Sequence, residues 1–181
     1  PIEGLTLHTD DNIAPLVETS VDDGGVLHLG MRAGANFRTR HAIGATVEVK
    51  QLNSLKIFGP GDATCADLDA DRIEITLAGP GDVHVESLHS ASVVVRLQGG
   101  GSVRLSGTSA QQDYFIEGAG EVDADELVGR AVVVRAAGSG KAKIWATESL
   151  LVDINGSGDV RYRGQPALTS SVRGTGRLIH Q

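Results

Sequence analysis

The sequence predicts an all-β protein: a right-handed parallel β-helix (solenoid) of about seven coils with an atypical β N-terminal cap. Pairs of the form Gly-x-Gly recur seven times, and the steps between them are 20, 20, 19, 20, 18 and 18 residues. A fixed period of this length is typical of a solenoid, in which each repeat is one turn stacked on the last. The structural corner glycines are Gly59, Gly61, Gly79, Gly81, Gly99, Gly101, Gly118, Gly120, Gly138, Gly140, Gly156, Gly158, Gly174 and Gly176.

Apolar and polar residues alternate on both sides of each glycine pair, which predicts two strands in every repeat. Val93, Val95 and Leu97 precede one pair, and Val103 and Leu105 follow it. A period of two places every second side chain inside, whereas a helix would need a period near 3.6. A short third side is indicated by a leucine seven residues after the second glycine in three repeats: Leu68, Leu88 and Leu127.

Each glycine pair is predicted to form a sharp corner between two strands. At least one residue per corner is expected to have a positive φ, which glycine adopts without the steric penalty of other residues. Equivalent strands of successive coils would pair in parallel at a spacing of roughly 4.8 Å, so that their inward side chains stack. The right-handed crossover rule for parallel strands predicts the hand of the coil.

We expect residues 1–181 to form a single domain, with 1–50 as the N-terminal cap and first strands and 51–181 as the coils. A cap is expected because the first coil of a solenoid has unpaired strand edges. Its predicted elements are strands at Leu5 and Leu7 and at Val26, Leu27 and Leu29, a tight turn over 22–25, a polar loop over 33–41, and an alternation at Ala45, Val47 and Val49 that leads into the first full coil.

The C-terminal coil is expected to be incomplete, because only five residues follow Gly176. A partner chain or a segment outside this sequence could cover such an open end. Homo-oligomerisation is therefore a hypothesis.

Composition excludes some classes of function. The formal net charge of −7 argues against nucleic acid, which requires a basic surface. No run of 18 apolar residues exists, so no membrane span is expected in this segment. Three Phe, two Tyr and one Trp leave little aromatic surface for a sugar-binding groove. The single cysteine, Cys65, lies at an inward strand position and is expected to be a small buried hydrophobe.

No motif indicates a catalytic residue, a cofactor or a metal. Gly138-Ser139-Gly140-Lys141 superficially resembles a phosphate loop, but Arg135 and Ala142 stand where a glycine and a Ser or Thr are required. The histidines and the cysteine lack the spacing of a zinc site, and no serine lies in a nucleophile elbow. We therefore expect no cofactor.

Two groups of outward residues are candidates for surface binding. A corner column contains Asp62 and Asp82, whose carboxylates could bind Ca²⁺ or act as an acid–base pair, or could accept backbone N–H bonds as aspartate does in turns. The mixed charges further along this column favour the last alternative. A basic strip on the second strand contains Arg104, Lys143 and Arg161, together with Arg163, and is expected to pair with Asp123 and Glu121.

The chain resembles the auto-transporter adhesin, head GIN domain family of bacterial envelope proteins. The resemblance is carried by the corner sequence at 156–160, by the run at 145–150 with 152–155 after it, and by 11–19, which looks like the family's N-terminal region. It implies a right-handed parallel β-helix in an exported protein, periplasmic or on the cell surface, whose signal peptide is not in this chain. The family has no assigned catalytic residues to carry over.

Three functions follow as hypotheses. The first is a non-enzymatic envelope or surface protein, an adhesin or scaffold whose partner is a glycan or another envelope component. The second is a carbohydrate-active enzyme, which would require two or three of the residues Asp62, Asp82, Arg104 and Glu121 to converge in a groove with at least one aromatic platform. The third is a module that assembles end to end through its incomplete last coil.

Overall fold

The computed structural model describes residues 3–36, 38–39 and 42–181. It is nearly all β, with one short 3₁₀ helix, η1, at Ala14–Leu16 among the described residues. Backbone contacts divide the chain into two compact units, Pro1–Lys50 and Gln51–Gln181. Each unit is described by itself, and the single domain over 1–181 stays a prediction. Within the predicted polar loop, residues 37, 40 and 41 lie outside the described residues.

The N-terminal unit consists of two antiparallel strand pairs. β1 pairs with β4, and β2 pairs with β3. The turn between β2 and β3 is held by Asp22, whose Oδ1 accepts hydrogen bonds from the backbone N–H groups of Gly24 and Val26 at 2.9 and 3.0 Å. The strands are β1 (Gly4–His8), β2 (Val17–Val21), β3 (Leu27–Met31) and β4 (Gly44–Glu48).

The alternation at Ala45 and Val47 lies in a strand, β4, which precedes the first coil in the sequence. Its partner was not predicted: β4 runs antiparallel to β1, with Ala45 opposite Leu7 and Val47 opposite Leu5. An alternating pattern predicts a strand equally well in either direction of pairing, so it could not identify the partner.

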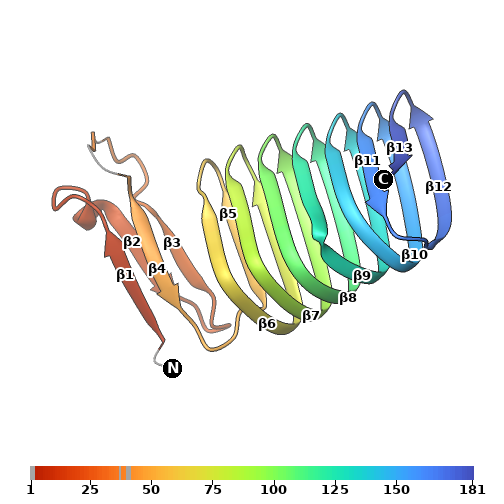
Figure 1. Ribbon diagram of the computed structural model, residues 1–181. Helices are drawn as coiled ribbons and strands as arrows, with labels where there is room; N and C mark the ends of the chain where they lie inside the picture. Colours follow the sequence, from red (N-terminus) through yellow and green to blue (C-terminus); the bar gives the residue numbers. More distant parts are fainter. Residues whose placement is uncertain (1–2, 37, 40–41) are drawn as a thin grey trace. The chain divides into compact units, whose positions relative to one another are not determined.

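The second unit is a solenoid of about seven stacked coils built on one parallel sheet, as predicted. Figure 1 shows the tight corners aligned along one side and the strands curving through the opposite side. The predicted short third side is not a separate connector, because each long strand bends through it without interruption. The strands are β5 (Ser54–Phe58), β6 (Ala63–Ala78), β7 (Asp82–Gly99), β8 (Ser102–Gly118), β9 (Glu121–Gly138), β10 (Lys141–Gly156), β11 (Asp159–Arg163), β12 (Ala167–Gly174) and β13 (Arg177–His180).

The register between coils follows the glycine spacing. Val83 pairs with Val103, Val103 with Val122, and Val122 with Ala142, which are offsets of 20, 19 and 20 residues. Inward residues therefore form continuous columns, and the side chains predicted to face inward in the central coils are almost completely buried. Burying these aliphatic columns is the main source of stability, because each coil covers the apolar side chains of its neighbours.

The two glycines of a corner are required for different reasons. The first has a positive φ in all seven corners, for example 118° at Gly99 and 109° at Gly118, as expected for the sharp turn. The second meets the corner of the preceding coil: a Cβ on Gly120 would lie 2.6 Å from the carbonyl oxygen of Gly101. Gly61 begins the series, and a Cβ there would make only an ordinary contact.

This difference predicts the effect of two matched substitutions. Gly120→Ala should lower the free energy of unfolding by about 2 kcal/mol or more, because the added methyl group overlaps a backbone carbonyl that cannot rotate away. Gly61→Ala, at the equivalent corner position, should change it by less than about 0.5 kcal/mol. Urea denaturation of both variants measures this, and equal losses would contradict the stacking constraint.

A small polar cluster interrupts the apolar columns. Gln112 occupies a column position held by Val93 and Val132 in the neighbouring coils, and it is 1% exposed. Its Oε1 accepts a hydrogen bond of 2.9 Å from the Tyr114 hydroxyl, and its Nε2 donates to the Leu127 carbonyl at 3.2 Å. Burial raises the pKa of the Tyr114 hydroxyl, which therefore stays a neutral donor.

Tyr114→Phe is accordingly expected to lower the free energy of unfolding by about 1–3 kcal/mol, since it leaves the buried Gln112 oxygen without a donor. The double variant Tyr114→Phe/Gln112→Leu should recover part of this loss, because it removes the unsatisfied group. Thermal or urea unfolding of the wild type, the single variants and the double variant measures these free energies. A double variant less stable than the sum of the two single variants would argue against the hydrogen bond as the cause.

The last coil is open. β12 pairs only with β10 and β13 only with β11 among the described strands. Leu168 and Val172, which continue inward columns, are 43% and 44% exposed, since none of the described strands pairs with the outer edge of β12. Homo-oligomerisation through this end remains a prediction.

Candidate functional site: the bulged face of β9

The site begins with a mismatch in repeat length. From one glycine corner to the next, the coil of β9 takes 20 residues, whereas its neighbours, which contain β8 and β10, take 19 and 18. The additional residues of the β9 coil cannot all pair with the shorter neighbouring strands, so they have to form a bulge in the sheet. Register shifts lie at Arg104/Ser106 on β8 and at Ile144/Trp145 on β10. Ala124 pairs with Ile144 and Val128 with Trp145, so residues 125–127 have no partner on β10.

The bulge carries acidic side chains to the outer face of the sheet. Asp123 and Asp125 alternate with the buried Ala124, and their side chains are 18% and 24% exposed. Glu126 follows and is exposed; its Oε2 accepts a 3.2 Å hydrogen bond from the Ser106 hydroxyl on β8. A half-open hollow of about 330 Å³ lies beside them.

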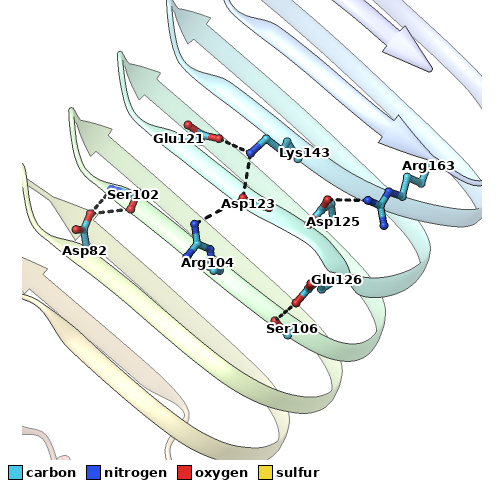
Figure 2. A network of polar contacts seen from close by, with 10 residues as sticks. All are labelled: Asp82, Ser102, Arg104, Ser106, Glu121, Asp123, Asp125, Glu126, Lys143 and Arg163. Atoms are coloured by element: carbon cyan, nitrogen blue, oxygen red, sulfur yellow. Dashed lines mark hydrogen bonds and ion pairs between the residues drawn. The ribbon is translucent and has the colours of Figure 1, made fainter. Parts of the chain in front are cut away.

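Basic side chains from the flanking strands surround these acids (Figure 2). Lys143 Nζ on β10 lies 2.9 Å from Glu121 Oε1 and 3.0 Å from Asp123 Oδ2. Arg104 Nη2 on β8 lies 3.9 Å from the same Asp123 oxygen. The face is thus a network of mutually compensated charges that spans β8 to β10.

A second ion pair reaches across a whole strand. Arg163 Nη2 on β11 lies 3.1 Å from Asp125 Oδ2 on β9, although β10 lies between these two strands. The residue of β10 in register with Arg163 is Trp145. Trp145 stands between the buried Ile144 and Ala146, so it belongs to the outer face and is half-buried there. The Arg163–Asp125 pair therefore crosses β10 at the level of the indole.

The two neighbouring carboxyl groups have pKa values displaced in opposite directions. Partial burial raises the pKa of Asp125, and the hydrogen bond with Asp123 and its negative charge raise it further, against the charge of Arg163. Partial burial alone would also raise the pKa of Asp123, but hydrogen bonds from Lys143 and Asp125 outweigh it, so that pKa lies below the ordinary 3.8. The environment thus distinguishes a more acidic and a less acidic carboxyl group within one pair.

The predicted basic residues are brought to this face. Arg104 and Lys143 meet at Asp123, and Arg161 is in register with Lys143. Arg161 is exposed and forms no ion pair within 4.0 Å among the residues described here.

The corner aspartates are used differently. Asp62 Oδ1 accepts a 2.9 Å hydrogen bond from the backbone N–H of Asp82. Asp82 Oδ1 in turn accepts bonds from Ser102, at 3.2 Å from its backbone N–H and 2.6 Å from its hydroxyl. Each carboxylate thus binds the backbone of the next coil. Of the set Asp62, Asp82, Arg104 and Glu121, Arg104 and Glu121 belong to the network around Asp123 and Lys143. All four do not gather around one point, because register places Asp82 two coils away from Glu121.

Residues that the sequence analysis did not single out complete the site: Asp125, Glu126 and, as an outward aromatic group, Trp145. The signal that could have located them is the irregular spacing of the glycine pairs, since the excess residues must leave the ladder somewhere between Gly120 and Gly138. Within the described part of the chain, no three His, Cys, Asp or Glu side chains are arranged to hold a metal ion. No described helix is long and apolar enough to cross a membrane.

Comparison with known proteins places this geometry in context. The profile of the family described as "Putative auto-transporter adhesin, head GIN domain" matches residues 2–166. This confirms the resemblance found in the sequence. A search of curated proteins gave no match.

Solved structures of similar fold include proteins of Bacteroides and Parabacteroides species. A "putative adhesin" from Bacteroides fragilis is 27% identical with a TM-score of 0.93, over 99% of this chain and 83% of that one. A "putative lipid binding protein" from Parabacteroides distasonis is 21% identical with a TM-score of 0.81, over 98% and 83% of the two chains. A "putative adhesin" from Parabacteroides merdae is 22% identical with a TM-score of 0.73, over 98% and 82%. The latter two show likeness of fold alone.

The carboxyl pair yields a test by pH. Because the pKa of Asp125 is higher in the folded protein than in the unfolded chain, ionisation of Asp125 costs folding free energy at neutral pH. Asp125→Asn should therefore leave the free energy of unfolding at pH 7 unchanged or raised. Asp123 has the opposite sign, so Asp123→Asn should lower it by about 1 kcal/mol.

Both differences from the wild type should vanish in acid. That of Asp125→Asn begins to shrink as the pH falls through the raised pKa of Asp125, and it is gone once this group is protonated in the unfolded chain as well. That of Asp123→Asn is gone once the pH falls below the lowered pKa of Asp123. Carboxyl ¹³C chemical shifts report the two titrations directly. Titration of both groups at 3.8 would contradict the coupled pair.

Proposed function

The chain belongs to the family described as "Putative auto-transporter adhesin, head GIN domain", and from this membership we propose that it is a non-enzymatic binding protein of the bacterial envelope or cell surface. Its ligand is a glycan or another envelope component, and the bulged face of β9 is the surface that binds it. Exported proteins of this kind work where such polymers are abundant, either in the periplasm or on the outside of the cell.

The observation that carries this proposal is the open polar face itself. Charged side chains from β8, β9, β10 and β11 converge around Asp123 and Asp125 beside a half-open hollow of about 330 Å³. Hydrogen-bond donors and acceptors that lie this close together can replace their contacts with one another by contacts with a polar ligand. The regular strands hold the side chains at fixed separations, which suits a polymer better than a small enclosed molecule.

A binding array of glycans and envelope polymers tests the proposal. The wild-type protein should bind a limited subset, and Arg104→Glu/Arg161→Glu should weaken that binding by about tenfold or more, because two attractive charges become repulsive. The matched control is Lys56→Glu/Arg72→Glu, which changes the net charge equally at exposed positions on β5 and β6. Absence of selective binding by the wild type would sink the proposal, and equal loss in both double variants would move the ligand away from this face.

A carbohydrate-active enzyme is the second candidate, and the Asp123–Asp125 pair favours it. Two adjacent carboxyl groups with pKa values displaced in opposite directions are the arrangement that separates a general acid from a general base. Incubation with a panel of acidic polysaccharides distinguishes the candidates. Chain cleavage that is lost in Asp125→Asn would support the enzyme, and intact polymers throughout the panel would exclude it.

A further inference from the structure

On the outer face around Trp145, more cationic than anionic side chains of the described residues are free of an ion pair and can contact a ligand. Four of its carboxylates are already engaged by a cation: Glu121 and Asp123 by Lys143, Asp125 by Arg163, and Asp159 by Arg177 at Oδ1 and Oδ2. Glu126 is exposed and accepts a hydrogen bond from the Ser106 hydroxyl. Its remaining cations, Lys141 and Arg161, are exposed and have no carboxylate within 4.0 Å among the described residues.

These cations and the indole lie on a small grid set by the register. Over residues 141–146 of β10 the outward residues are Lys141, Lys143 and Trp145, and on β11 Arg161 is in register with Lys143. Neighbouring strands are roughly 4.8 Å apart, so a ligand of one or two sugar rings can touch the indole and a free cation together.

Trp145 is suited to contact a sugar ring. It is the single tryptophan of the chain, and it lies half-buried on an outer face that otherwise consists of charged and small side chains. The π-face of an indole is electronegative and attracts the polarised C–H groups on one side of a pyranose ring. Charged neighbours such as Asp125 and Arg163 then supply hydrogen bonds for hydroxyl groups at the ring edge.

We propose that Trp145, together with Arg161 and Lys141, binds an acidic saccharide, with the sugar ring against the indole and its carboxylate at the free cations. This inference rests on the proposed function and names its ligand class. A carboxylate is the group that a guanidinium binds with two parallel N–H bonds. Among the described residues no carboxylate lies within 4.0 Å of Arg161, and the neighbouring Asp159, whose charge interacts with Arg161 at longer range, is already bound by Arg177. The net charge of −7 disfavours densely charged polymers, whereas a sugar acid with one charge per ring needs only a local positive site.

The single tryptophan makes the test direct. Tetragalacturonate should change the intrinsic fluorescence of the wild-type protein saturably, since a ring placed on the indole displaces water from it. The methyl ester of the same oligomer keeps the rings and lacks the charge, so it should bind at least about tenfold more weakly. Arg161→Glu should show the same loss, and Arg72→Glu, an equal charge change on β6, should retain wild-type affinity.

Calorimetry with variants of the indole completes the design. Trp145→Phe keeps an aromatic ring and should bind tetragalacturonate within a few-fold of wild type, whereas Trp145→Ala should lose about tenfold or more. Equal binding of the ester and the acid, or unchanged affinity in Trp145→Ala, would overturn this inference. If the array shows selective binding of envelope polymers while tetragalacturonate leaves the fluorescence unchanged, the acidic-saccharide site is wrong and the proposed function stands. An array without any binding overturns the proposed function itself.

Discussion

The close approach of one glycine corner to the next is the constraint on which the solenoid depends. A side chain at the second corner glycine would overlap a carbonyl of the preceding coil, as at Gly120 over Gly101. With glycine there, each corner bonds directly to the one before it, for example from the Glu121 N–H to the Gly101 carbonyl at 3.1 Å. This contact fixes the register of both strands that leave the corner, and the inward columns are aligned as a consequence.

Because the corners are fixed, any difference in repeat length has to appear elsewhere. The excess of the β9 coil over its neighbours emerges on the curved side opposite the corners, where residues 125–127 leave the ladder toward β10. The same irregularity brings Asp125 within reach of Arg163, two strands away. The candidate site thus arises because the glycine corners keep a fixed register while the repeats between them differ in length.

The fold could be predicted almost completely from the sequence, since glycine spacing and period-2 alternation are properties of single residues repeated many times. The candidate site could be predicted only in part. The alternation of apolar and polar residues predicted that Arg104, Lys143 and Arg161 lie on one face. The acid that each of them contacts depends on the bulge in β9, and a strict alignment of the repeats does not show this bulge. Gln112 shows the same limit, because its partner Tyr114 lies two residues away but the Leu127 carbonyl comes from the next coil.

The distribution of charge on the outer face of the sheet differs between its paired and unpaired parts. A ladder of strands with outward acids and bases tends to neutralise itself, since register neighbours are held at a spacing that suits ion pairs. Such pairing leaves little net attraction for a ligand unless charges of one sign outnumber the partners of the other sign. This is the case where Arg161 lies in register with Lys143 and the neighbouring acids, Asp123 and Asp159, are already bound by Lys143 and Arg177. The single tryptophan lies close to them, so an outward indole coincides with cations that have no carboxylate within 4.0 Å in the described part of the chain. That coincidence, more than the number of charges on the face, is the reason why we propose this region as the binding surface.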